Sequence, residues 1–388
     1  MSTGIEIKRP RVLHVMGHMQ RGGAEMRLLE VMRHLCPSEF HADVCALSGL
    51  PGRLDDDVRA CGGAVIPLKL NASFPRRFIR LLRKQRYDVV HSHVLHTSGA
   101  ILFLAAAAGA PVRIAHLRAM DDGHTSTWRR RMQRNLMLHF IDRYATHIAA
   151  CGEGAMNAIW RPGWQSDARC QIVYNSVDPT RFEVPPDSSR VRESLGLSRG
   201  SHVFLHVGNE VAEKNHRRLL AIFAEIAKTD ASSRLVLVGA GTDNPQGISG
   251  RAIADLSLRD KVVSLGVRDD VPQLLKASDA LLLPSRREGL PGIVLEACVV
   301  GIPVVATDLP GVREIASRLA LVRCLPLSTP DCEWAATALA MPEEARRIGL
   351  RAKAADAFRA SVFHIDRAVE AHRRLWNGMK ERSVSRCF

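Results

Sequence analysis

Two glutamates stand eight residues apart in an otherwise apolar stretch, and their types and spacing suit the binding of a polar ligand. Glu288 lies in a loop after a predicted strand, and Glu296 lies near the first turn of a helix predicted over about 293–300. A buried carboxylate is costly unless a polar group compensates it. Backbone N–H groups at the start of the helix would suit an anion. The two acids together predict a site for a ligand with hydroxyl groups and negative charge, such as a sugar-nucleotide.

A purely structural role for the two acids is the main alternative. Glu288 could form a salt bridge with Arg286 or Arg287, and Glu296 could be an ordinary acid near a helix start, where the helix dipole favours it. This alternative explains one acid by itself more readily than it explains both acids together.

Two further loops have the composition of anion sites. Gly22 and Gly23 follow the first predicted strand and precede a helix, so backbone N–H groups could approach a phosphate closely. Lys214 precedes a helix that Asn215 could cap, and a cation beside a helix start favours phosphate. The alternatives are a tight turn and a solvated surface lysine. Neither loop matches G-x-G-x-x-G, so the dinucleotide-binding fingerprint is absent.

The spacing of possible metal ligands does not favour a metal site. His91, His93 and His96 cluster in the sequence, and residues 55–57 contain an Asp-x-Asp. His91 and His93 would share one face of a strand, but no carboxylate or cysteine nearby completes a ligand set. We therefore predict no metal and no other cofactor.

Short apolar strands that alternate with helices would position these loops, and this alternation predicts parallel sheets covered on both faces. A stretch rich in Pro, Asp and Ser at 178–190 separates two such series. The predicted fold class is α/β, with two doubly wound Rossmann-like domains that carry the site in loops after the strands. The predicted strands are 11–17, 41–47, 87–93, 111–117, 146–152, 171–175, 202–208, 234–241, 261–266, 280–285, 303–307 and 321–326.

The composition favours a soluble protein with an anionic partner. The 388 residues suffice for two domains, and 54 Lys and Arg against 40 Asp and Glu give a net charge of +14. The nine cysteines include no C-x-x-C and predict reduced thiols. We see no signal-peptide core at the beginning, and the apolar run at 100–112 is too short to span a bilayer. A cytoplasmic protein is expected.

Two basic amphipathic helices are predicted in the first domain, over 74–86 and 128–143. Such helices suit an anionic membrane surface, so a peripheral position on the inner face of the plasma membrane is one interpretation. Surface helices whose apolar faces pack on the sheet are the alternative. Nucleic acid is not favoured as a partner, because no interleaved aromatic platform or known binding motif is present.

Nearly the whole chain resembles glycosyltransferase family 4, whose members are retaining enzymes with the GT-B fold. The specific signature is Glu, seven residues, Glu in EGLPGIVLE, within a longer block at 264–315. The resemblance implies an N-terminal acceptor-side domain at 1–185, a nucleotide-sugar donor domain at 186–363 and a helix within 364–388 that returns to the first domain. Shorter blocks in family order are GGAE at 22–25, DVVHSH at 88–93, YNSVDPTRF at 174–182 and EKNH at 213–216.

The resemblance also implies a role for each matching residue. Glu296 would bind the ribose hydroxyls, and Glu288 would hold the donor sugar. Lys214 would pair with the diphosphate leaving group, and His116 would border the transferred sugar. The remaining donor contacts would come from Gly289, Leu290 and Pro291 at the sugar, from Gly23 at the phosphate, and from Gly266 to Arg268 at the base.

Three positions depart from the family pattern. Asn209 stands where Arg is common, Gly292 where Asn or a related residue is common, and Ser176 where Gly is common. Because Asn209 carries no charge, the donor diphosphate would meet one cation fewer there, unless another arginine has taken its place.

The predicted function is transfer of a sugar from a nucleotide-sugar, with UDP as the expected nucleotide, to an acceptor hydroxyl with retention of configuration. Exopolysaccharide or lipid-linked glycan synthesis is the expected setting. The alternatives are glycosylation of a soluble natural product, another reaction of the same fold such as sugar-nucleotide epimerisation, and a non-catalytic subunit that holds a nucleotide-sugar.

Overall fold

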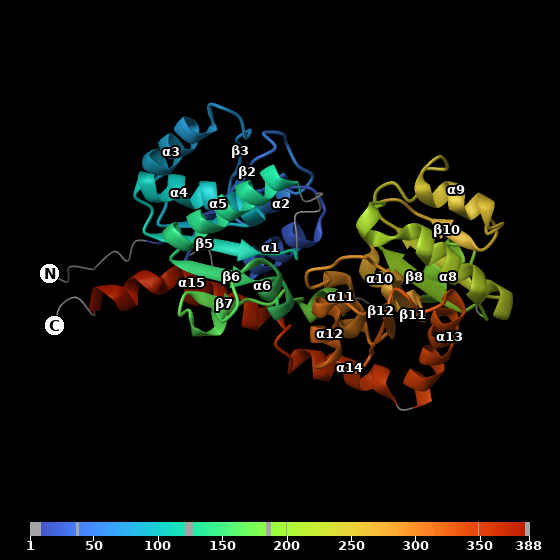
Figure 1. The fold of residues 1–388 in the computed structure, drawn as a ribbon. Coiled ribbons are helices and arrows are strands. Elements are labelled where there is room, and N and C mark those ends of the chain that lie inside the picture. Colours follow the sequence, from blue (N-terminus) through green and yellow to red (C-terminus); the bar gives the residue numbers. More distant parts are fainter. Residues whose placement is uncertain are drawn as a thin grey trace. The chain divides into compact units, whose positions relative to one another are not determined.

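The chain folds into two α/β units (Figure 1). A computed structural model describes residues 9–35, 39–120, 127–183, 188–198, 200–347 and 349–384. Unit 1 contains the chain up to Asn175 together with the part from Ile365 on, and unit 2 runs from Ser176 to His364. The domain boundary that we expected between 185 and 186 lies outside the described residues.

Unit 1 is built on a parallel sheet of seven strands in the order β3-β2-β1-β4-β5-β6-β7. The order reverses between β1 and β4, and such a switch point is where doubly wound sheets bind ligands. The strands are β1 (Arg11–Met16), β2 (His41–Ala46), β3 (Val65–Pro67), β4 (Val89–Ser92), β5 (Val112–Leu117), β6 (His147–Ala150) and β7 (Cys170–Ile172). The helices are α1 (Gly23–His34), α2 (Asp55–Ala60), α3 (Phe74–Gln85), α4 (Ser98–Ala108), α5 (Trp128–Tyr144), α6 (Glu153–Ile159) and α15 (Ile365–Val384).

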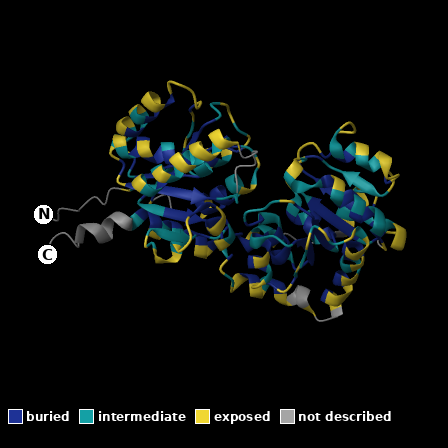
Figure 2. Ribbon diagram, viewed as in Figure 1, coloured by how far each residue is buried: buried dark blue, intermediate teal, exposed yellow. Residues whose placement is uncertain are grey.

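The last helix, α15, packs on the sheet of unit 1. Its Val369 and Trp376 share one apolar cluster with Val12, Ile114 and Val173 of the strand region. The central strands β1, β4, β5 and β6 are mostly buried because both faces of the sheet are covered, and Figure 2 shows strands of this sheet in dark blue as buried. Residues from the far end of the chain therefore complete the core of the first unit.

Unit 2 repeats the architecture with a parallel sheet of six strands in the order β10-β9-β8-β11-β12-β13. Its switch point lies between β8 and β11. The strands are β8 (Val203–Val207), β9 (Arg234–Val238), β10 (Val262–Ser264), β11 (Ala280–Leu283), β12 (Val304–Thr307) and β13 (Val322–Leu325). The helices are α7 (Ser188–Ser194), α8 (His216–Thr229), α9 (Ile248–Asp255), α10 (Val271–Ala277), α11 (Gly292–Val300), α12 (Pro310–Ala316), α13 (Asp331–Arg347) and α14 (Leu350–Arg359).

The predicted fold class and every predicted strand are confirmed. The sequence missed β3, a three-residue edge strand that ends in a proline. So short a segment carries too little periodicity to stand out from a loop.

Candidate functional site

The loop after β8 and the loop after β11 are fastened to each other at the switch point of unit 2. Asn215 Nδ2 donates to the Pro284 carbonyl over 3.1 Å, and the Arg286 backbone N–H donates to the Glu213 carbonyl over 2.7 Å. Arg287 forms an ion pair with the Glu213 side chain. Asn215 has a φ of 58°, a left-handed conformation that asparagine tolerates better than most residues. Side chains on the two loops are therefore held in fixed positions relative to one another.

Lys214 and Glu288 meet across these two loops. Lys214 Nζ lies 2.7 Å from Glu288 Oε1, and the two side chains are 23% and 11% exposed. The structural alternative named Arg286 or Arg287 as the partner of Glu288, whereas the structure pairs Glu288 with Lys214. The site thus places a cation for an anionic group directly beside a carboxylate that can accept hydrogen bonds from hydroxyls.

The segment before α11 is pinned in place. Leu290 is buried, and Pro291 is the extended residue that precedes the helix, with φ −70° and ψ 115°. A Cβ at Gly311 would lie 1.6 Å from the Gly289 carbonyl oxygen, so α12 approaches this loop closely only because residue 311 is glycine. Glu296 is half-buried and is the fifth residue of α11, so it lies near the first turn of the helix, as predicted.

The residues predicted to meet the base and the phosphate are engaged in local contacts. Asn209 Oδ1 accepts from the Ala240 backbone N–H over 3.0 Å, and Gly266 has a φ of 63°, which favours glycine. Arg268 donates through Nε and Nη2 to Asp270 over 2.8 and 2.7 Å, and these hydrogen bonds lower the pKa of Asp270. Arg268 therefore has a counter-ion of its own, Asp270.

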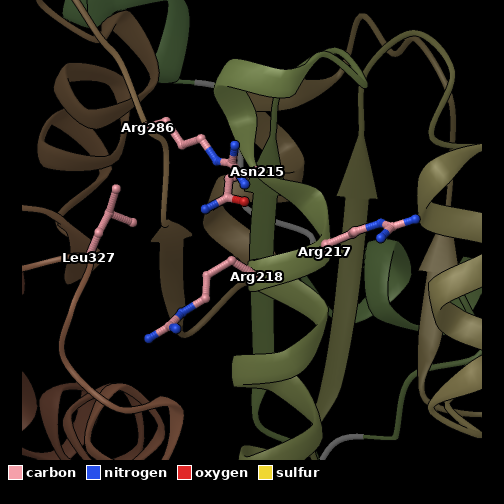
Figure 3. Close-up of a pocket in the computed structure, with 5 residues that line it drawn as sticks. All are labelled: Asn215, Arg217, Arg218, Arg286 and Leu327. Carbon is pink, nitrogen blue, oxygen red and sulfur yellow. The ribbon is translucent and has the colours of Figure 1, made fainter.

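A cavity of about 410 Å³ opens beside the same loops. In Figure 3, Arg218 reaches toward the side of Leu327, whereas Arg217 extends away from it. Arg218 Nε lies 2.8 Å from Asp331, so that guanidinium is neutralised. The positive lining suits an anion, and the sequence analysis did not find this cavity because its lining comes from the start of α8 and from two other segments far apart in the chain. The lining residues are Asn215, Arg217, Arg218, Arg286 and Leu327.

Unit 1 contains a cluster of buried histidines at its own switch point. None of the five is more than 9% exposed. The ring centroids of His91 and His93 are 4.3 Å apart, and those of His91 and His116 are 5.2 Å apart. The cluster consists of His14 on β1, His91 on β4, His93 directly after β4, His116 on β5 and His372 on α15.

Trp376 begins a chain of hydrogen bonds that determines which ring nitrogen carries the proton in His91 and in His116. Trp376 Nε1 lies 3.3 Å from His91 Nδ1 and can only donate. Neutral His91 therefore carries its proton on Nε2 and donates it to His116 Nδ1 over 3.1 Å. The proton of His116 is left on Nε2, and the ring also has a hydrogen bond with the Val173 backbone.

A second chain starts from Arg118, the residue after β5. Arg118 Nε donates to His93 Nδ1 over 2.9 Å. His93 therefore carries its proton on Nε2 and donates it to His14 Nδ1 over 3.0 Å. Arg118 Nη1 also donates to Asn175 Oδ1 over 3.1 Å. Sequence reasoning did not single out Arg118, although its place just past the carboxyl end of a strand is where ligand-binding residues gather.

All five histidines are neutral. Removal from water lowers the pKa of His14, His91, His93 and His116 well below the usual value, and it lowers the pKa of His372 to about 4. The positive charge of Arg118 acts in the same direction on each of them.

The nitrogens of two histidine triplets are close enough to share a metal ion, but their hydrogen bonds favour another state. The triplets are His14, His91, His93 and His91, His116, His372. A ligating histidine normally donates its second ring N–H to an acceptor. Here Nδ1 of His91 and Nδ1 of His93 instead accept hydrogen bonds, from Trp376 and Arg118 respectively. The arrangement therefore favours a neutral, hydrogen-bonded cluster.

The two unit 1 residues that the resemblance singled out lie in different surroundings. Gly23 is exposed and begins α1, and a Cβ there would meet nothing within 4 Å, so a ligand has room to approach. The His116 ring is fully buried, so a sugar could reach it only if neighbouring side chains moved.

Two family models match most of the chain. The model described as "Glycosyl transferase 4-like domain" matches residues 22–176, and the model described as "Glycosyl transferases group 1" matches residues 201–326. Within the described residues, no helix combines the length and the apolar composition that a membrane span requires.

Curated relatives match over most of their own length. The capsular polysaccharide biosynthesis glycosyltransferase CapH of Staphylococcus aureus is 32% identical over 294 residues, which are 74% of this chain and 78% of CapH. The UDP-Gal:alpha-D-GlcNAc-diphosphoundecaprenol alpha-1,3-galactosyltransferase of Escherichia coli is 28% identical over 325 residues, 80% of this chain and 81% of the enzyme. The crystal structure of Anabaena HepE in complex with UDP has a TM-score of 0.78 at 19% identity and covers 96% of this chain and 100% of HepE.

Proposed function

The chain belongs to the group 1 glycosyltransferases of family 4, retaining enzymes that use nucleotide-sugars, and from this premise we propose that it moves a hexose from a UDP-sugar to a hydroxyl of a lipid-linked glycan. The observation that carries the proposal is the contact of Lys214 with Glu288, because it joins a cation and a carboxylate at one switch point. UDP is supported by the ligand of HepE, and a lipid-linked acceptor by the name of the Escherichia coli relative.

We assign the donor to unit 2 and the acceptor to unit 1. In unit 2, Lys214 meets the diphosphate, Glu288 and the backbone of 289–291 hold the sugar, and Glu296 binds the ribose hydroxyls. The fastened loops support this assignment, because they preorganise charged groups around one place. Gly266 and Arg268 lie on the base side. His116 stays a prediction, since its ring is buried.

In the proposed reaction, the acceptor oxygen forms a bond to the anomeric carbon as the bond from that carbon to the diphosphate oxygen breaks. The proton of the acceptor hydroxyl passes to the departing phosphate oxygen. Lys214 stabilises the negative charge that grows on the diphosphate, and such preorganised groups supply several kcal/mol. Because a fixed cation takes this task, we propose that transfer needs no metal ion.

Release of UDP that depends on the acceptor is the test of this function. The protein is incubated in EDTA with UDP-glucose, UDP-galactose or UDP-N-acetylglucosamine, with and without a lipid-diphosphate-linked sugar, and UDP release and product mass are measured. A non-catalytic subunit would bind UDP-sugar without release, and an epimerase would convert the sugar without any acceptor. A soluble-product enzyme would ignore lipid-linked acceptors and accept water-soluble ones.

The surface of α5 supports a membrane-bound acceptor and a position on the cytoplasmic face of the plasma membrane. Trp128, Met132 and Leu136 lie four residues apart on this helix and are 65%, 62% and 49% exposed. Three consecutive arginines, at 129–131, lie between the first two of these apolar residues in the sequence. The apolar residues Phe74, Phe78 and Leu82 of α3 are instead buried in the core, so α3 has no comparable exposed stripe among them. An exposed apolar stripe beside arginines suits an anionic lipid surface.

Flotation with anionic liposomes is expected at low salt and should be lost at high salt. Replacing Arg129, Arg130 and Arg131 on α5 by Gln should reduce the floated fraction several-fold, because each basic residue near such a surface contributes about 1 kcal/mol. The matched control carries the same loss of charge on α3, where Arg76, Arg77 and Arg80 are exposed. Equal flotation of the two triple variants would assign the attraction to net charge rather than to α5.

A further inference from the structure

Arg118 is a guanidinium held in one orientation at the carboxyl edge of the unit 1 sheet. Its Nε bonds to His93 after β4 and its Nη1 bonds to Asn175 beyond β7. Two of the five N–H donors of the guanidinium are used in this way. The residue is only partly buried, and the two groups that it bonds to, His93 and Asn175, carry no negative charge. Donors fixed in direction but lacking an acceptor are a preorganised binding group.

The acidic neighbour of Arg118 does not neutralise it directly. Glu25, in the first turn of α1, interacts electrostatically with Arg118 without an ion pair. The Glu25 carboxylate is turned toward Gly22, where an added Cβ would lie 2.4 Å from Oε2. Burial raises the pKa of Glu25, so its own charge is disfavoured there. Arg27 is already paired with Glu30 at 2.9 Å.

The position of Arg118 coincides with the place where this topology binds ligands. Its partner His93 follows β4, and Glu25 belongs to the helix that follows β1. The strand order reverses between these two strands, and the crevice beyond their carboxyl ends is the usual ligand site. Guanidinium groups bind phosphate oxygens in a bidentate manner more strongly than neutral acceptors.

We propose that Arg118 is an oxyanion-binding residue that receives a phosphate or diphosphate group of one of the two substrates. His93 and Asn175 act as positioning residues that fix its orientation. The inference rests on the proposed function, since that function supplies substrates with diphosphate groups, either on the donor nucleotide or on the acceptor lipid. It adds to unit 1 a binding group that the family signature did not mark.

The test follows the Arg118 Nε–H resonance by NMR, because a proton bonded to a buried histidine exchanges slowly. The resonance is assigned by its loss in Arg118→Lys. Adding inorganic pyrophosphate should shift it to saturation, whereas the Nε resonance of Arg113 should stay in place. Arg113 is a matched control within the same spectrum, because it lies on β5, the strand that Arg118 follows, and its Nε donates to the Tyr144 carbonyl over 2.7 Å.

UDP and pyrophosphate identify the source of the anion. A shift with both ligands assigns the site to the donor, and a shift with pyrophosphate alone assigns it to the acceptor. In either case Arg118→Gln should raise KM for that substrate about tenfold or more, as expected when a charged hydrogen bond is lost. Glu25→Gln should tighten pyrophosphate binding several-fold, because it removes an acidic group that interacts electrostatically with Arg118.

Two results would overturn the inference. One is an Arg118 resonance that neither anion moves. The other is weaker pyrophosphate binding in Glu25→Gln, which would mean that the pair binds neutral hydroxyl groups. Pyrophosphate binding needs no turnover, so a protein that binds it at Arg118 but transfers no sugar would refute the proposed function and leave the anion site standing.

Discussion

Lowering the pH from about 6.5 to 5.5 is expected to remove about 5 kcal/mol from the free energy of unfolding of unit 1. A histidine buried in its neutral form has a folded-state pKa below the unfolded value of about 6.5. The unfolded chain therefore takes up protons first, so this stabilisation is complete above about pH 6.5 and is lost as the pH falls. Each of the five histidines of the cluster contributes about 1 kcal/mol over this interval. The loss is comparable to the whole stability of many domains, about 5–15 kcal/mol.

Urea unfolding at a series of pH values, followed by circular dichroism and tryptophan fluorescence, checks this expectation. His372→Gln should make the dependence on pH shallower by about one proton. Burial raises the pKa of Glu25, so this one group favours the folded state as the pH falls and offsets only part of the effect of the five histidines. A urea midpoint that stays constant down to pH 5.5 would mean that the histidines are charged or solvated.

Lys214→Ala is expected to lower turnover about 10²-fold or more, as observed when a donor to a developing oxyanion is removed. The affinity for UDP-sugar should fall much less, because the charge on the diphosphate is largest in the transition state. The mutation also leaves Glu288, which is 11% exposed, without its cation. Single-turnover kinetics together with calorimetry of UDP-sugar binding separate the two effects.

Two variants control for the loss of a lysine as such. Lys214→Arg keeps the charge and should retain more activity than Lys214→Ala. Lys228→Ala removes a lysine from α8 that is 71% exposed and paired with Glu225, and it should leave turnover and binding unchanged. Near-normal turnover of a folded Lys214→Ala protein would place the diphosphate elsewhere, and the assignment of the donor to these loops would be refuted.

The fold could be predicted from the sequence because its determinants are local. Apolar runs such as Leu281–Leu283 and Val304–Ala306 alternate with helices, and this pattern requires a sheet covered on both faces. The break at 178–190 separated the two series. The edge strand Val65–Pro67 was not predicted, because it forms through pairing with β2 and its own residues show no strand pattern.

The site could be predicted only in part. The loops that carry Lys214 and Glu288 were located because each follows a strand, but their direct contact joins positions far apart in the chain and no local pattern encodes it. The histidine cluster illustrates the same limit. His91 was singled out as one member of a motif, whereas His372 and Trp376 reach it from α15. Periodicity shows that a residue is buried, but not which side chains it meets.

The return of α15 to unit 1 has a consequence for the order of events during synthesis. The strands of unit 1 leave the ribosome first, but the helix that covers one face of their sheet follows the whole of unit 2. Until then the apolar cluster around Val12 and Ile114 lacks Trp376, and His91 lacks its donor. Domains usually fold as units in the order of their synthesis. Here the unit that is translated first is completed last, so the nascent chain exposes the part of the apolar cluster that α15 covers for as long as the second unit is being made.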